Sequence, residues 1–112
     1  MINFDLNEEH KLLVKAVREW AEADVASRIH DLDRERRFDR SILRQMSSLG
    51  LLGISIPQEY GGSGMDYVSL GLASEELEYV DTSLRVILSV HVALNSLSLL
   101  TWGTEEQKQR YL

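Results

Sequence analysis

Apolar side chains recur every three or four residues along most of the chain, which is the spacing of helices that bury one face. In the first such stretch Leu13, Val17 and Trp20 mark the inward face, and charged residues fill the other side. Asn7 precedes this stretch and can cap free backbone N–H groups, so we predict a first helix that starts after it. Between residues 24 and 37 the pattern weakens, and we expect an irregular or shorter helix there, mostly solvated.

Asp39 is the start of a second predicted helix, because Phe38 before it and Leu43 four positions after it form the hydrophobic-staple arrangement. Gly50 follows the apolar stripe and supplies the left-handed residue at which many helices end. The stripe between these two signals comprises Ile42, Leu43, Met46 and Leu49. After the glycine, we expect the segment 51–57 to be extended chain.

A glycine-rich stretch, 58–64, is expected to be a surface loop. Asp66 then starts a third predicted helix, with Met65 and Leu70 as its staple pair, and the helical period continues to about Val80.

The stretch 83–102 is apolar on nearly every side, and Asp81 and Thr82 can cap its start. A helix of this kind is usually buried, so we expect it at the centre of a helical domain.

A last helix follows Gly103, because Thr104 and Gln107 have the spacing of a capping box. The chain stops at Leu112, two turns into that helix, and a short isolated helix is marginal in water. We therefore expect residues 1–112 to be one truncated domain. The whole pattern predicts an all-α domain of five or six helices packed around the long apolar helix.

The chain has 112 residues, 44% hydrophobic and 27% charged, with a formal net charge of −6. Its basic residues are scattered among acids, so we expect neither nucleic acid nor a membrane as a partner. The absence of cysteine excludes disulfides and thiolate chemistry. No signal peptide is visible, and we expect a cytoplasmic protein. Arg85, His91 and Asn95 interrupt the stretch 84–100, which we expect to be too short and too polar to span a bilayer.

Few residues are candidates for metal binding, catalysis or phosphate binding. His10, His30 and His91 lie far apart, and none has a second ligand at metal spacing on its helical face, so we expect no metal site. His91 could act as a general base, although nothing at helical distance orients it. The glycine run 61–64 lacks the buried strand and the lysine of a phosphate loop, and a flexible turn is the expected structure.

Three glutamates near the end of the third helix face different surroundings. Glu75 and Glu78 share a face, which we expect to be solvated and to make ion pairs. Glu76 points toward the apolar stripe, and a carboxylate there needs a hydrogen-bond partner.

Polar residues form two stripes along the long apolar helix, namely Arg85–Ser89–Ser96 and His91–Asn95–Ser98. Such residues cost free energy unless they are hydrogen-bonded. In a structural interpretation, these residues form hydrogen bonds to other helices or face a partner domain. In a functional interpretation, one stripe lines a ligand cavity. Spacing alone favours the structural interpretation.

Four segments resemble the acyl-CoA dehydrogenase family, in order and with the family's spacing. They are 6–10 (LNEEH), 50–67 (GLLGISIPQEYGGSGMDY), 75–91 (EEL, VDTS and LSVH) and 103–112 (GTEEQKQRYL). No single motif is decisive, but their joint occurrence over essentially the whole chain is specific.

The resemblance implies the amino-terminal helical domain of a three-part enzyme, with the middle β-domain and the carboxy-terminal helical domain absent. The family oxidises the Cα–Cβ bond of an acyl-CoA thioester: a glutamate base removes the α-proton, FAD accepts a hydride, and an electron-transferring flavoprotein takes the electrons. In the family the flavin contacts and the base come from the later domains. We therefore expect no catalytic or cofactor-binding residue here, and a chain that alone neither oxidises acyl-CoA nor retains FAD. Family members are commonly homo-oligomers.

By alignment to the family, one wall of the acyl-chain pocket falls on Arg85, Val86, Ser89 and Ala93, along one face of the long helix. Ser89 and Ala93 are small and would leave room for an acyl tail. The subgroup that resembles glutaryl-CoA dehydrogenase has an arginine at the position of Arg85, where it could pair with a distal carboxylate. Val86 stands where that subgroup has a serine, so a short- or medium-chain acyl-CoA is the expected substrate.

Two other functions stay open on the sequence. One is a stand-alone helical module that binds a fatty-acyl ligand or a partner protein, and the other is a purely structural interaction domain. If partner domains exist, apolar surface is expected where they dock.

Overall fold

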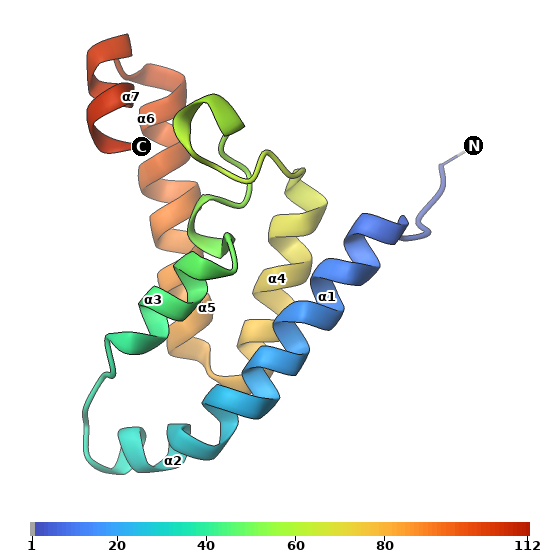
Figure 1. Ribbon diagram of the computed structural model, residues 1–112, viewed down its shortest axis with the longest axis vertical. Helices are drawn as coiled ribbons and strands as arrows, with labels where there is room; N and C mark the ends of the chain where they lie inside the picture. The colour runs from blue at the N-terminus through green and yellow to red at the C-terminus, as the bar shows by residue number, and fades with distance from the viewer. Residues whose placement is uncertain (1) are drawn as a thin grey trace.

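Helices make up most of the computed structural model, which describes residues 2–112 (Figure 1). The first continuous helix consists of α1 (Glu8–Trp20), the π-helical η1 (Ala21–Val25) and α2 (Ala26–Arg34). The next two are α3 (Ser41–Ser48) and α4 (Tyr67–Val80). The fourth consists of α5 (Thr82–Ser89), the π-helical η4 (Val90–Ser96) and α6 (Leu97–Trp102), and α7 (Glu105–Tyr111) is the fifth. No strand occurs within the described range, so the all-α prediction and the predicted number of helices are confirmed.

Three predicted helix starts are confirmed as side-chain caps. Asn7 and Asp66 each accept a hydrogen bond from the backbone N–H three residues later at 2.8 Å, and Thr104 does so at 3.2 Å. Asp39 acts slightly differently, because its carboxylate accepts from the N–H of Ser41 at 2.9 Å and α3 begins at that serine. These bonds satisfy backbone donors that the first turn of a helix leaves free.

At Asp81 the chain breaks between α4 and α5, as predicted, but without the predicted cap. Asp81 has an extended backbone with φ −163°, and its side chain makes no capping hydrogen bond. Thr82 turns its hydroxyl toward Glu78 instead. The prediction for 24–37 is confirmed: the π-helical η1 ends at Val25, α2 has 9 residues, and most side chains in this range are exposed, with Leu32 buried on the inward face.

The prediction of extended chain over 51–57 is wrong. Gly50 does end α3 in the left-handed region, with φ 76°, but a 3-10 helix, η2 (Leu51–Gly53), follows at once. Ile54 and Ile56 then turn inward and are buried. The glycine loop folds tightly over this segment, because a Cβ atom on Gly62 would lie 2.1 Å from the carbonyl oxygen of Ile56. Packing of the loop onto the segment just before it therefore sets the backbone here.

The helices are arranged as a thin layer. α1 packs along α4, and α4 packs along α5, while η2, which packs against α3, contacts η4 of the long fourth helix (Figure 1). The extents are 42 × 39 × 19 Å, so the molecule is less than two helix diameters thick. Its core consists mainly of Val17, Val25, Ile42, Met46, Leu51, Ile54, Leu77, Leu84, Leu88 and Val92.

The fourth helix is buried on one face only, which differs from the expected central position. Its buried residues Leu84, Leu88 and Val92 follow one another at intervals of four, and the remaining sides are half-buried or exposed. A layer this thin can cover one side of a helix but cannot surround it.

The length of this helix corrects another expectation. It runs without a break for 21 residues, Thr82–Trp102, and by length and composition it could cross a membrane. The prediction that the stretch is too short and too polar is therefore wrong. Core helices of soluble proteins pass the same test, so the length alone does not show whether this helix crosses a membrane.

Candidate functional site

The four residues predicted to form a pocket wall lie on the fourth helix, three in α5 and one in η4. Arg85 and Ser89 are half-buried, whereas Val86 and Ala93 are exposed. Their side of the helix is therefore accessible in this chain. Four cavities among the described residues are lined by other side chains, so none of these four contains the predicted wall residues.

Arg85 is held by partners on two elements. Its Nε donates to the Oε2 atom of Glu78 on α4 at 2.9 Å, and its Nη1 donates to the Oγ atom of Ser89 at 3.3 Å. The hydroxyl of Thr82 donates to the other Glu78 oxygen at 3.1 Å. The hydrogen bond from Arg85 is the main cause of a lowered pKa at Glu78, and the bond from Thr82 adds to it. The result is a fixed ion pair across the junction of α4 and α5.

Ser89 completes this network. Its hydroxyl donates to the backbone carbonyl of Arg85 at 2.8 Å and accepts from the guanidinium of the same residue. The structure thus brings Arg85 and Ser89 into contact, as their spacing of four residues predicts.

Ala93 is separated from the other three residues by a change of helix type. From Val90 to Ser96 the helix is π-helical, and the N–H of Leu97 bonds to the carbonyl of Val92, five residues back. The wider turn displaces Ala93 from the position that a regular α-helix gives it relative to Ser89. Short π-helical segments within α-helices occur frequently at functional sites.

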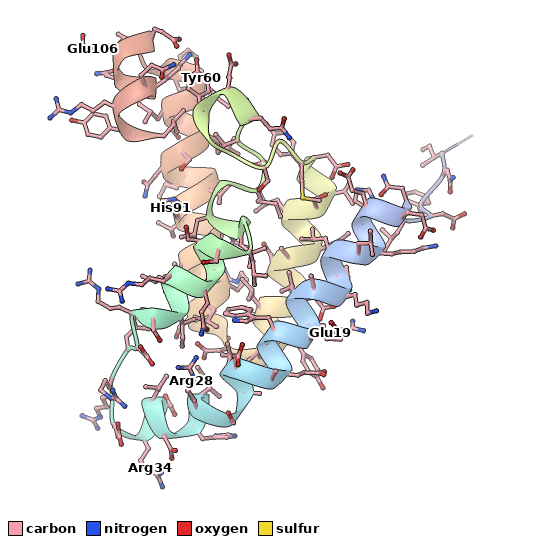
Figure 2. The ribbon with its side chains drawn as sticks, in the orientation of Figure 1. Glu19, Arg28, Arg34, Tyr60, His91 and Glu106 are labelled. Atoms are coloured by element: carbon pink, nitrogen blue, oxygen red, sulfur yellow. The ribbon has the colours of Figure 1, made fainter. Side chains whose placement is uncertain are left out.

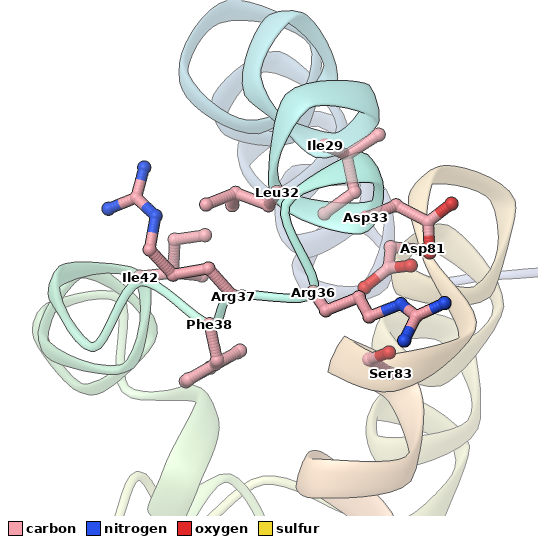
Figure 3. Close-up of a pocket in the computed structure, with 9 residues that line it drawn as sticks. All are labelled: Ile29, Leu32, Asp33, Arg36, Arg37, Phe38, Ile42, Asp81 and Ser83. Carbon is pink, nitrogen blue, oxygen red and sulfur yellow. The ribbon is translucent and has the colours of Figure 1, made fainter.

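One cavity of about 310 Å³ lies between the end of α2 and the start of α5 (Figure 3). Arg36 extends toward Ser83 in this cavity, with Asp33 and Asp81 nearby, whereas Arg37 points the other way (Figure 3). Charges of both signs therefore face the space. The other lining residues are Ile29, Leu32, Phe38 and Ile42.

A second cavity, of about 350 Å³, lies where the glycine loop meets η4 and α7. His91 and Ser96 line it from the long helix, where His91 projects from the middle (Figure 2). Tyr60 lines it from the loop and donates to Glu105 on α7 at 2.9 Å, and this bond raises the pKa of Tyr60. His91 itself makes no side-chain hydrogen bond within residues 2–112, so no group orients it as a base.

Two of the predicted polar candidates have structural roles. His10 is 8% exposed, lies with Nε2 2.9 Å from the carboxylate of Asp66, and accepts at Nδ1 from the N–H of Asn7 at 3.4 Å. Glu76 has the partner that its position requires, because Arg18 donates to both its oxygens, at 2.6 and 3.0 Å. This two-pronged bond raises the pKa of Arg18.

The sequence did not identify Glu78 as the partner of Arg85. Ion pairing was expected at Glu78, but its partner depends on how α5 turns back along α4 after Asp81. Seven residues separate Glu78 from Arg85, and only the extended backbone at Asp81 brings them together. Opposite charges on the two sides of a predicted helix break are the sequence signal that could have predicted this ion pair.

Comparison with known proteins identifies the family of this chain. Residues 7–112 match the family described as acyl-CoA dehydrogenase, N-terminal domain. The short-chain-specific acyl-CoA dehydrogenase of Clostridium acetobutylicum is 40% identical over 111 residues, which cover 99% of this chain and 29% of the relative.

Two solved structures share the fold. A glutaryl-coenzyme A dehydrogenase in complex with glutaryl-CoA has a TM-score of 0.94 at 33% identity, over 98% of this chain and 29% of that one. An acyl-CoA dehydrogenase from Bacillus anthracis in complex with FAD has a TM-score of 0.88 at 34% identity, over 100% of this chain and 20% of that one. The chain spans less than a third of the length of each of these proteins. The chain belongs to the acyl-CoA dehydrogenase family and corresponds to its amino-terminal helical domain.

Proposed function

We propose that this chain forms one wall of the acyl-chain pocket in an FAD-dependent acyl-CoA dehydrogenase, on the face that bears Arg85, Val86, Ser89 and Ala93. The observation that carries the proposal is the accessibility of this face along α5 and η4. Small side chains at Ser89 and Ala93 leave room beside the helix, and apolar residues border them. An acyl tail needs such a surface, with few polar groups and no free charge.

The proposal includes further domains that would complete the pocket. The chain spans less than a third of the relatives named above, so residues 1–112 would be one domain beside a middle β-domain and a carboxy-terminal helical domain. The residues that remain exposed on the outer turns of the long helix would pack against these domains. Catalysis would then rest on residues outside this chain.

The glycine loop does not offer FAD a site for its pyrophosphate. A flavin pyrophosphate is commonly bound by free backbone N–H groups. In the glycine loop, three successive N–H groups already donate within the chain: Gly62 to Pro57, Ser63 to Gly53, and Gly64 to Ile56. We therefore place the FAD site in the other domains.

The expected substrate is a short- or medium-chain acyl-CoA. Val86, beside Arg85 on this wall, is apolar and exposed, which favours an uncharged acyl chain. We also infer an electron-transferring flavoprotein as the electron acceptor, a homo-oligomeric enzyme and a cytoplasmic location.

The cofactor assignment is tested by the visible absorption spectrum of the 112-residue chain after incubation with FAD and desalting. We expect no flavin band. A retained, stoichiometric band would overturn the assignment of FAD to other domains, and binding of a fatty-acyl ligand without any dehydrogenase activity in the longer protein would favour a stand-alone module instead.

The wall is tested by Ala93→Leu in the FAD-loaded dehydrogenase that contains this domain. The added side chain should shorten the space for the acyl tail, so kcat/KM should fall by about tenfold for longer straight chains and little for butyryl-CoA. Ala16→Leu, an equal change at an exposed site on α1, is the matched control and should leave the chain-length profile unchanged. Equal profiles for the two variants would remove Ala93 from the wall.

A further inference from the structure

Arg36 is held in a costly backbone conformation beside the cavity between the end of α2 and the start of α5. It has φ 52°, in the left-handed region that residues with a Cβ atom rarely adopt. Residues kept in such conformations cluster at sites that bind ligands. The guanidinium extends into the cavity toward Ser83 (Figure 3) and makes no side-chain hydrogen bond within residues 2–112. Its donors are therefore free for a ligand that enters the cavity.

Two carboxylates face the same space and are also without partners. Asp33 lines the cavity from α2, and Asp81 lines it from the break before α5 (Figure 3). In the part of the chain that the structure describes, neither side chain makes a hydrogen bond or an ion pair. Charged groups of both signs thus border one cavity without binding each other, and each gains if a ligand supplies the opposite charge.

An apolar surface completes the cavity. Leu32 and Ile42 are buried in the core, Ile29 beside them is half-buried, and Phe38 adds a ring that is 42% exposed. A hydrocarbon group placed here would remove apolar surface from water. The volume of about 310 Å³ is near the lower end of the range for ligand pockets, so the ligand has to be small.

We propose that this cavity binds a small zwitterion with a hydrocarbon side chain, which is the chemistry of a free apolar α-amino acid. Its carboxylate pairs with Arg36, its ammonium group pairs with Asp33 and Asp81, and its side chain packs on the apolar surface. None of the four residues of the proposed wall lines this cavity, so the inference does not rest on the proposed function.

Other classes of small ligand match the cavity less well. A simple anion is repelled by the two aspartates, and a simple cation is repelled by Arg36. An uncharged apolar ligand takes water away from three charged side chains and gives them no partner in return. An α-amino acid has both charges on neighbouring groups and a side chain beside them, so it satisfies all three kinds of lining residue.

The proposal is tested by isothermal titration calorimetry of the 112-residue chain with L-leucine and L-phenylalanine. We expect saturable binding at a single site. Isoamylamine and isocaproate are leucine without its carboxylate and without its ammonium group, and glycine lacks the side chain. Each should bind roughly tenfold or more weakly than leucine, because each loses a charge-assisted bond or the buried hydrocarbon. No saturable binding of either amino acid, or equal affinity for leucine and isocaproate, would overturn the proposal.

Arg36→Met and Arg37→Met form a matched pair of variants. Both replace a guanidinium by an uncharged long side chain, but Arg37 points away from the cavity (Figure 3) and pairs with Glu35. Arg36→Met should weaken leucine binding by roughly tenfold or more without weakening isoamylamine binding, whereas Arg37→Met should change neither. All three side chains are exposed, and unchanged far-ultraviolet circular dichroism would show that the helices are intact. An equal loss of leucine binding in both variants would contradict the role of Arg36.

Nuclear magnetic resonance locates the ligand independently of its affinity. Added leucine should shift the backbone amide signals of residues 29–38 and 81–83, and Asp33→Asn should reduce these shifts at a given leucine concentration. The signals of residues 89–93, on the proposed wall, should stay in place. Shifts confined to residues 89–93 or to any other part of the chain would place leucine elsewhere and overturn the assignment to this cavity.

Discussion

At the scale of single residues, one carboxylate joins the starts of two helices. Asp66 accepts from both the N–H and the hydroxyl of Ser69, at 2.8 and 2.7 Å, and caps α4. It also lies 2.9 Å from the Nε2 atom of His10, which belongs to the capping box of α1. The bonds from Ser69, and then the bond from His10, lower the pKa of Asp66 to about 2.

This shift predicts a specific acid sensitivity. The folded pKa of about 2 lies below the ordinary 3.8, so ionised Asp66 stabilises the fold fully above pH 3.8, and the contribution is lost as the pH falls toward 2. Asp66→Asn keeps a capping side chain but removes the charge. Thermal unfolding followed by circular dichroism should show a lower Tm for the variant at neutral pH and a gap that closes over that range.

The control for this experiment is Asp33→Asn, which changes an exposed aspartate whose side chain makes no hydrogen bond among residues 2–112. Its Tm should match the unmodified chain throughout. A gap for Asp66→Asn that stays constant from neutral pH to pH 2 would contradict the link between its charge and stability.

At the scale of elements, the sequence predicts helix starts better than it predicts backbone geometry between and within helices. The caps at Asn7, Asp66 and Thr104 involve groups three residues apart, so a local pattern contains all the information. The π-helical turns of η4 have no such pattern. The compact fold after Gly50 depends on a loop residue, Gly62, packed against the backbone oxygen of Ile56, and neither helical periodicity nor capping patterns describe such a contact.

The candidate site likewise contains one contact that the sequence predicts and one that it does not. The contact between Arg85 and Ser89 follows from their spacing on one helix, whereas the ion pair with Glu78 requires the turn between α4 and α5. Family resemblance supplied the predicted position of the wall. It did not supply the partner of its arginine, because that partner is a matter of side-chain geometry.

The left-handed residue at the end of α2 predicts a substitution that stabilises the fold. Arg36 has φ 52°, a left-handed conformation that glycine normally adopts, and the N–H of Arg37 bonds to the carbonyl of Leu32 at 2.9 Å in the manner of a Schellman stop. Arg36→Gly removes the clash of Cβ, partly offset by greater freedom of the unfolded chain. The free energy of unfolding should rise by about 0.5–1 kcal/mol in urea denaturation.

Arg36→Ala serves as the control, because it deletes the same guanidinium but keeps the Cβ atom. It should show no gain. If glycine and alanine gave equal stability, the left-handed backbone at Arg36 would not be the source of strain.

At the scale of the whole molecule, thinness determines which surfaces stay apolar. Val86, Val90 and Leu94 lie on successive turns of the fourth helix, with 40%, 43% and 65% of their surface exposed. A layer of helices 19 Å thick has no second layer to cover them. Exposed apolar stripes of this kind mark surfaces that contact other protein, a membrane or a ligand, and we propose that this one packs against further domains.

We expect the isolated chain to bind a hydrophobic probe dye or to self-associate through this stripe. Leu94→Lys should reduce dye fluorescence and the sedimentation coefficient more than Leu12→Lys does. Leu12, on α1, is the matched control because it is also 65% exposed. Equal effects of the two substitutions, or a monomer that binds no dye, would remove the stripe as a docking surface.

The one-sided burial of the fourth helix also has a consequence during synthesis. Until the outer turns are covered, a nascent chain displays an uncharged stretch from Val86 to Thr104 in a folded helix that cannot hide it. Transiently exposed apolar surface is what chaperones bind and what drives aggregation. If further domains cover this face, as proposed above, the domain depends in the cell on how soon they do so, and the residues that would hold the assembled protein together are those that put the newly made one at risk.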